Sequence, residues 1–538
     1  MSMGSMIGAS DRRLTDQASR GRAARWALAG LCLLAFLSIL WLTPFGMSAT
    51  GDSASYVGAA RNAAEGRGIS RPTGGGEVKP LTHFPPLYPL TLAIFEILGM
   101  DSVGAARWLA GALFAANVLL IGISIKAATG SNSGALAGSL LVLLSPIMIR
   151  LHVWILSEPL YLALLSYAFL LLSLFTKTRD RRLLVAGGVI IGLAYATRYV
   201  GIAVVGTAAL AFLWMGKREW RRSVKDTALL LVLGLGPMVA WVVRNLMVAG
   251  TATNRRLTWH PFPVSYLKRP FSIVWEWLLP FPFSYAALYG MIALCVILLA
   301  VVLYRRRAGL GLEVPPRGAS DPASPGLVTL HGLHMLVYTA LLVVSISLLG
   351  ASTPIDDRTT APLYIGFLIV GVILGVQTWG SNARKPWTRP MVVGLVVLVL
   401  ASYTYQDVAL IGQLRRDASG YASRSARESP TMKAMQELSP GTILYTNEPE
   451  QVYFVSGRGA YMIPIKIDAV TGRASPAFAQ KLEDMREDLL GGNAALVLFR
   501  TIEARPDLAS PQEMDGGLRV LFEGNDGRIF VGPSFPDG

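Results

Sequence analysis

The chain has 538 residues, of which 52% are hydrophobic and only 15% are charged. A typical soluble domain has about 25% charged residues, so the mean hydropathy of +0.47 indicates a protein with many membrane spans. The formal net charge is +15, but the basic residues cluster between apolar stretches. We therefore expect no nucleic-acid partner. The two cysteines, Cys32 and Cys295, both fall in predicted spans, so they form no disulfide framework.

Residues 1–25 are predicted to be a basic cytoplasmic tail that precedes the first span. The first apolar stretch, 26–47, is long enough to cross a bilayer, and no small-residue cleavage site follows it, so we expect a retained anchor. About eleven spans are predicted by apolar length, and they make up a transmembrane domain over 26–410. They lie near 26–47, 104–125, 132–150, 158–176, 183–197, 199–216, 227–246, 284–304, 330–350, 361–379 and 390–409.

The loops between these spans alternate in charge. Four loops on one side, 176–182, 216–226, 305–309 and 382–389, are rich in Lys and Arg. Cytoplasmic loops carry such an excess, so the N-terminus is predicted to be cytoplasmic. The other side, with the first outer loop 48–103 and all residues after about 410, is then extracytoplasmic.

The first outer loop is predicted to be ordered. In "GDSASYVGAARNAAEG" the apolar residues recur at helical spacing, so a short helix is expected to begin near Asp52. A Gly-rich turn "PTGGGE" (72–77) follows. The apolar stretch within 82–99 is too short to span a bilayer comfortably, so we expect it to lie in or re-enter the membrane interface.

The tail over 411–538 differs in composition from the rest. Short apolar stretches at 441–449, 494–500, 518–524 and 527–532 are typical of buried strands, and 429–439 and 476–490 are typical of helices. This pattern predicts a small extracytoplasmic α/β domain. The tail contains no metal-ligand, P-loop or GxSxG motif, so we interpret it as a structural or acceptor-docking domain.

Two acids at outer span boundaries are the candidate catalytic residues. Asp52 follows the first span, and Glu158 in "WILSEPLYLALL" begins the fourth. Each has a structural alternative: Asp52 as a helix N-cap, and Glu158 as an acid in a first turn that Ser157 caps and Pro159 opens. Two such acids in separate outer loops favour a functional pair that deprotonates an acceptor or holds a metal.

Basic residues on the outer side form the complementary set. Arg198 lies at an outer turn, against the usual charge distribution, and Arg358 begins the tenth span. Such cations suit the phosphate of a lipid headgroup. For Arg150 and Arg244 we favour interface anchoring. The neighbouring "DD" at 356–357 leaves open a local salt bridge to Arg358.

These segments resemble the GT-C membrane glycosyltransferases, in particular the bacterial group related to protein O-mannosyltransferases and the lipid A aminoarabinose transferase. The resemblance rests on the order and spacing of "GDSASYVGAARNAAEG", "HFPPLYPLTLAIF", "SEPLYLALL", "GLAYATRYVGIAV" and "DRTTAPLYIGFLIV". It covers about 20–410, and it implies a GT-C-like α-helical membrane fold in a bacterial plasma membrane.

The resemblance also implies a function. Such enzymes move a hexosyl or pentosyl group from a polyprenyl-phosphate carrier to a glycan, lipid or protein acceptor on the outer side of the membrane. Asp52 matches the usual candidate base and Glu158 the second acid. The substrate's phosphate and sugar are assigned to five residues that the resembling segments contain: His83, Tyr88, Arg198, Tyr199 and Arg358.

Two departures from the family pattern limit these assignments. Some relatives carry a Lys or Arg just before the loop prolines, where this chain has His83 and Phe84. Many place a Glu after the first acid, where this chain has Ser53, which disfavours a bidentate metal role for that pair. A divalent metal stays possible but is not assigned. Two alternatives also stay open: a transporter, disfavoured because the polar residues lie at span ends and no internal repeat is evident, and a non-catalytic protein that binds lipid-linked sugar.

Overall fold

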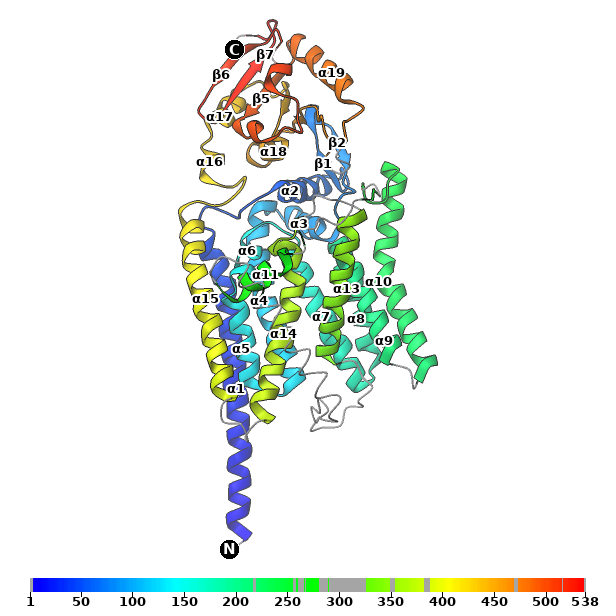
Figure 1. The fold of residues 1–538 in the computed structure, drawn as a ribbon, viewed down its shortest axis with the longest axis vertical. Coiled ribbons are helices and arrows are strands. Elements are labelled where there is room, and N and C mark those ends of the chain that lie inside the picture. Colours follow the sequence, from blue (N-terminus) through cyan, green and yellow to red (C-terminus); the bar gives the residue numbers. More distant parts are fainter. Residues whose placement is uncertain are drawn as a thin grey trace.

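The structure is a computed structural model. The model describes residues 3–215, 219–254, 258–259, 266, 268–279, 289, 326–348, 354–381, 388–468, 473–514 and 516–536. Figure 1 shows a bundle of long helices with an α/β domain on one end, while the N-terminal helix projects from the other end. This is the predicted fold class: a helical protein with many membrane spans and a small C-terminal domain that contains a sheet.

Within the described part of the chain, seven helices are long and apolar enough to cross a membrane. They belong to α1 (Met3–Leu42), α4 (Ser102–Thr129), α7 (Glu158–Thr178), α10 (Trp220–Ala249), α13 (Leu327–Leu348), α14 (Asp357–Ser381) and α15 (Thr388–Arg416). The consecutive helices α5 (Asn132–Leu143) and α6 (Pro146–Val153) pass the same test as a pair bent by 55°. The chain is therefore a multi-span membrane protein.

Eight of the eleven predicted spans coincide with these helices or with the bent pair. The stretches 183–197 and 199–216 form shorter helices, α8 (Arg181–Thr197) and, after the 3₁₀ turn η2 (Tyr199–Gly201), α9 (Ile202–Met215). The span predicted at 284–304 lies outside the described residues except for residue 289. The 132–150 span is broken because Ser145 caps a new helix that begins with Pro146, and proline cannot continue the preceding one.

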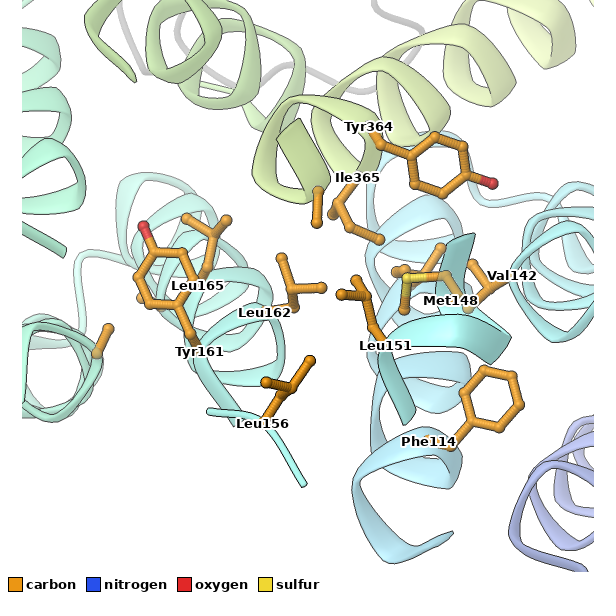
Figure 2. Packing of buried hydrophobic residues seen from close by; sticks show 14 of the residues in the cluster. Phe114, Val142, Met148, Leu151, Leu156, Tyr161, Leu162, Leu165, Tyr364 and Ile365 are labelled. Atoms are coloured by element: carbon orange, nitrogen blue, oxygen red, sulfur yellow. The ribbon is translucent and has the colours of Figure 1, made fainter. Parts of the chain in front are cut away.

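The membrane core is built from large apolar side chains of four adjoining helices. Figure 2 shows Phe114 of α4, Met148 and Leu151 of α6, Leu162 of α7 and Ile365 of α14 meeting in one cluster, and all five are buried. This packing fixes the outer ends of α7 and α14 next to each other.

The predicted first outer loop, residues 48–103, folds over the end of the bundle that bears the C-terminal domain (Figure 1). It contains α2 (Gly51–Ala64), a hairpin of β1 (Ser70–Pro72) and β2 (Val78–Pro80) around the turn η1 (Gly74–Gly76), and α3 (Leu87–Ile97). The strands pair in antiparallel register, with Arg71 opposite Lys79. Helix α2 packs on α3 and lies between the bundle and the C-terminal domain (Figure 1).

The C-terminal domain has a five-stranded sheet in the order β4-β3-β5-β7-β6. The strands are β3 (Ile443–Thr446), β4 (Tyr461–Met462), β5 (Ala494–Phe499), β6 (Arg519–Glu523) and β7 (Gly527–Val531). The helices are α16 (Arg424–Arg427), α17 (Pro430–Glu437), α18 (Pro449–Ser456), α19 (Phe478–Leu490), the 3₁₀ turn η5 (Arg500–Ala504) and α20 (Pro511–Met514). The remaining described helix of the chain, α11 (Arg269–Leu278), belongs to the membrane part.

The tail elements confirm the sequence prediction and add shorter elements to it. All four predicted strands and both predicted helices are present, with Ser429 as the N-cap of α17. The strand β4, the helices α16, α18 and α20 and the turn η5 were not predicted. β5 is buried along its whole length, because it lies between β3 and β7 in the sheet and its alternate side chains pack into two different apolar clusters.

Three distant segments meet where the bundle joins the domain. The Ser48 N–H donates to the Val153 carbonyl at 2.9 Å, and the Ser48 carbonyl accepts from Ile155 at 3.0 Å. On the other side, the Tyr421 N–H donates to the Ala49 carbonyl at 2.9 Å. These bonds fix where α2 begins relative to α7.

Candidate functional site

Asp52 is the second residue of α2, and it does not cap that helix. Thr50 occupies the N-cap position, where its N–H donates to Ser53 Oγ at 2.9 Å, and Ser53 Oγ donates to the Ile155 carbonyl at 2.8 Å. The Asp52 side chain is 32% exposed. The capping alternative is therefore wrong for Asp52, and its carboxylate is available for other contacts.

Glu158 begins α7 and is buried, with only 2% of its side chain exposed. Ser157 stands at the N-cap position, as predicted, but its side chain makes no capping bond. Instead, Ser157 Oγ accepts a hydrogen bond from Arg198 Nη1 at 3.1 Å and lies 3.1 Å from Tyr56 Oη. Ser157 and Glu158 thus both contact the guanidinium group of Arg198.

Arg358, at the start of α14, joins the two acids. Its Nη2 lies 2.6 Å from Asp52 Oδ2, and its Nε lies 2.7 Å from Glu158 Oε1. Arg198, which follows α8, places Nη1 2.7 Å from Glu158 Oε2. Four predicted site residues from four separate segments therefore form one cluster with two positive and two negative charges.

The exposure of these charges differs within the cluster. Arg358 and Asp52 are about one-third exposed, whereas Glu158 has no comparable access to solvent. A buried carboxylate needs paired cations because desolvation disfavours its charge. Glu158 thus holds both guanidinium groups in place, and Asp52 and Arg358 present their charge outward.

The structure gives the partners of three basic residues whose contacts the sequence left open. Arg358 pairs with Asp52 and Glu158 rather than with its neighbours, and Asp357 instead forms a 2.8 Å ion pair with Arg150. Arg244 donates to the carbonyls of Leu81 and Ile69 at 3.0 and 2.9 Å. Arg150 and Arg244 are therefore cross-linking residues, not simple interface anchors, because span ends and outer loops meet here.

A cleft of about 560 Å³ opens beside Asp52. It lies between α2, the hairpin strand β2, the segment after β2 and the end of α10. Its lining residues are Gly51, Asp52, Ser55, Arg71, Lys79, Pro80, Leu81, Thr82, His83, Phe84, Val248, Ala249, Thr251, Asn254 and Glu450. The predicted residue His83 is thus part of the cleft wall, and the wall combines cations with apolar side chains.

Two other predicted residues have a supporting position. Tyr88 is only 3% exposed, and its ring packs edge-on against Tyr56 at 5.0 Å between centroids. Tyr199 Oη donates to the Thr82 carbonyl at 2.7 Å and accepts from Trp241 Nε1 at 3.2 Å. Neither residue lines the cleft: Tyr88 lies in the packed core, and Tyr199 holds the backbone of Thr82, which is part of the cleft wall.

Tyr56 and Ser157 were not singled out from the sequence. Burial, together with the nearby negative charges of Asp52 and Glu158, raises the pKa of Tyr56, so its hydroxyl stays neutral. Arg71 and Lys79 were also missed. They flank the Gly-rich turn at symmetric positions, so a hairpin prediction there would have paired them. Within the described part of the chain, no three His, Cys, Asp or Glu side chains group as metal ligands.

Comparison with known proteins finds a family model that matches part of the chain and solved structures with a similar fold. Residues 83–243 match the family described as dolichyl-phosphate-mannose-protein mannosyltransferase. Two crystal structures of ArnT from Cupriavidus metallidurans, one bound to undecaprenyl phosphate and one in the apo state, are similar with a TM-score of 0.59. Their identities are 16% and 14%, over 95% and 96% of this chain and 98% and 99% of theirs. No curated protein sequence matches the chain significantly.

Proposed function

We propose that this chain, whose fold is that of the GT-C membrane glycosyltransferases, transfers a sugar from a polyprenyl-phosphate carrier to an acceptor on the outer side of the membrane. One observation carries the proposal: Asp52 and Glu158 meet Arg198 and Arg358 beside an open cleft at one end of the bundle. The undecaprenyl phosphate named for one similar structure supports a polyprenyl-phosphate donor.

The proposed reaction is a direct displacement at the anomeric carbon. The acceptor hydroxyl attacks that carbon while Asp52 takes its proton, and the bond between the carbon and the carrier phosphate breaks. The electron pair leaves with the phosphate oxygen, whose growing negative charge the guanidinium groups of Arg358 and Arg198 stabilise. A single displacement inverts the anomeric centre.

Arg358 links donor binding to the base. Its guanidinium is shared between Asp52 and Glu158. A phosphate that binds Arg358 competes with Asp52 for the same donors, while Glu158 keeps the arginine in place. Asp52 then becomes free to accept a proton only when the donor is present.

The charges of the predicted loops support a proposed orientation. If the basic loops lie in the cytoplasm, the N-terminus lies there too. α2 and the C-terminal domain are at the opposite end of the bundle from the N-terminus (Figure 1), so this orientation puts them and the cleft outside. The acceptor is a glycan, lipid or protein hydroxyl. We propose a bacterial plasma membrane as the location.

The test uses the full-length protein in nanodiscs. It is incubated with a panel of polyprenyl-phosphate sugars and an extract of envelope acceptors, and released polyprenyl phosphate is measured. Wild type should release it, and Asp52→Asn should lower turnover by about 10²–10⁴-fold without loss of donor binding, because a general base is lost. Glu437→Gln, on the exposed end of α17, serves as the matched control and should leave turnover unchanged.

Each alternative has its own outcome. Equal release by wild type and Asp52→Asn would remove Asp52 as the base and leave Glu158 to be tested. Donor binding without release from any sugar would favour a non-catalytic binding protein. Passage of a labelled donor headgroup across sealed vesicles without release would favour a transporter.

A further inference from the structure

A second cavity, of about 300 Å³, lies between the first outer loop and the C-terminal domain. Helix α2 and the β1–β2 hairpin form one side of it, and α18, β4 and α19 form the other. It shares Ser55, Arg71, Lys79 and Glu450 with the cleft beside Asp52. We call it the upper cavity. Ser55 lies three residues after Asp52 on α2, so the two spaces adjoin along one face of that helix.

The charges in the upper cavity are unbalanced. Arg71 and Lys79 are paired residues on adjacent strands, so two like charges stand directly opposite each other. Such a pair destabilises a hairpin unless an opposite charge lies near. Lys481 of α19 adds a third cation from the domain side, and Glu450 is the one carboxylate in the lining. Within the described residues, Arg71, Lys79 and Lys481 make no ion pair with any acid.

The two walls of the cavity are held at a fixed separation. A Cβ added at Gly74 would lie 2.2 Å from the ring of Tyr461, and one at Gly459 would lie 2.0 Å from the Thr73 carbonyl. The hairpin turn and β4 therefore touch so closely that only glycine fits on either side. Tyr453 and Tyr461 add aromatic surface to the lining.

We infer that the upper cavity binds an anionic sugar of the acceptor, one that carries a phosphate or a carboxylate. Three cations from two sides suit the anion, and the aromatic wall suits the apolar face of a sugar ring. The volume is at the small end of ligand sites, which fits one or two sugar rings. The inference rests on the proposed function, because the sugar bound there would present its hydroxyl to Asp52 in the adjoining cleft.

The test is equilibrium binding without any donor, so its failure is distinguishable from a failure of sugar transfer. Full-length protein in nanodiscs of neutral lipid is titrated with glucose 6-phosphate, trigalacturonate, neutral maltotriose and tetraglutamate. We expect the anionic sugars to bind in a salt-sensitive manner and maltotriose at least tenfold more weakly. Binding of only the phosphate or only the carboxylate sugar supports the inference and identifies the anion.

Some variants are expected to weaken the binding of the anionic sugar and one is expected to tighten it. Arg71→Gln and Lys79→Gln should each weaken binding about tenfold, because each removes a charge-assisted hydrogen bond. Glu450→Gln should tighten binding, because it removes the opposing carboxylate, and no loss of folding produces that effect. Lys433→Gln, an exposed lysine of α17 outside both cavities, should change nothing. Equal binding of maltotriose, preference for tetraglutamate, or indifference to all of these variants would overturn the inference.

Discussion

Asp52 in the outer loop and Asp526 in the C-terminal domain are two partly buried carboxylates with opposite surroundings. Asp526 accepts hydrogen bonds from Ser429 Oγ, from the Thr431 N–H at 3.3 Å and from Thr431 Oγ1 at 2.6 Å. These donors are neutral, and they join the turn before β7 to the start of α17. Asp52 has one charged partner, Arg358, and opens into a cleft.

The difference shows that Asp526 is a structural carboxylate, whereas Asp52 is available to contact a ligand. At Asp526, burial alone would raise the pKa, but the hydrogen bonds from Ser429 and Thr431 outweigh it and lower the pKa. Asp52 depends on a cation that is itself shared with Glu158. A ligand phosphate can displace that cation, whereas nothing from solvent replaces the donors around Asp526 without unfolding the start of α17.

The strongest way to test this contrast is to remove the residue that holds the charged cluster together. Glu158→Gln leaves Arg198 without an acid partner in the described structure, and Arg358 with Asp52 alone. We expect a loss of about 2–3 kcal/mol in unfolding free energy, below the range for a wholly buried pair because the arginines are partly exposed. Thermal unfolding in detergent measures it.

A surface ion pair provides the matched control. Glu276→Gln removes the exposed partner of Arg269 and should cost at most about 1 kcal/mol. The double variant Glu158→Gln with Arg198→Gln should recover part of the stability, because neither charge is then left unpaired. A single variant as stable as wild type would show that Glu158 does not hold the cluster.

A smaller effect is expected at Asp526. Asp526→Asn weakens charge-assisted bonds to Ser429 and Thr431 and should destabilise the C-terminal domain by about 1–2 kcal/mol. Because the folded pKa is lowered, this contribution is complete above the unfolded pKa of about 3.9 and is lost as pH falls through the folded value. Hydrogen exchange of the β7 amides between pH 3 and 6 measures it.

Turnover distinguishes the two aspartates directly. Asp526→Asn should keep its catalytic rate per folded molecule at neutral pH, whereas Asp52→Asn should lose it. If the wild-type and Asp526→Asn domains lost stability in parallel over the acid range, the carboxylate would not be the group responsible.

The smallest predicted effect concerns the bonds that fix the outer loop. Arg244→Lys keeps the charge but cannot reach both carbonyls, Leu81 and Ile69, with a planar group. The Leu81 N–H donates to the Ile69 carbonyl at 3.0 Å, so its hydrogen exchange reports on the hairpin. We expect faster exchange, by about fivefold, for a cost near 1 kcal/mol. Unchanged protection would assign Arg244 to interface anchoring after all.

Much of the fold was predictable because it depends on local patterns. Apolar length identified the long helices, and short apolar stretches identified four strands of the tail. Pro146 is visible in the sequence, but apolar length alone predicts one continuous span over 132–150. The strand β4 has only two residues, Tyr461 and Met462, so it has no periodicity to detect.

The sequence identified the residues that form the candidate site, but it did not identify which of them pair with each other. Asp52, Glu158, Arg198 and Arg358 were each unusual in their own segment, and this is a property of the sequence. Which arginine meets which acid depends on how α7 and α14 pack, and residues 158 and 358 are 200 positions apart. The local alternative, an ion pair between Arg358 and its neighbours, therefore could not be rejected from the sequence.

The junction of Ala49 with Gly420 has a consequence for the order of biosynthesis. A Cβ at Gly420 would lie 2.0 Å from the Ala49 carbonyl, so these backbones meet at a contact that only glycine permits. That contact closes a loop of more than two-thirds of the chain, and it cannot form until the last span has been inserted and residue 420 has been made. The first outer helix is made early, but it reaches its final position late, so an unfinished chain in the membrane has no completed site.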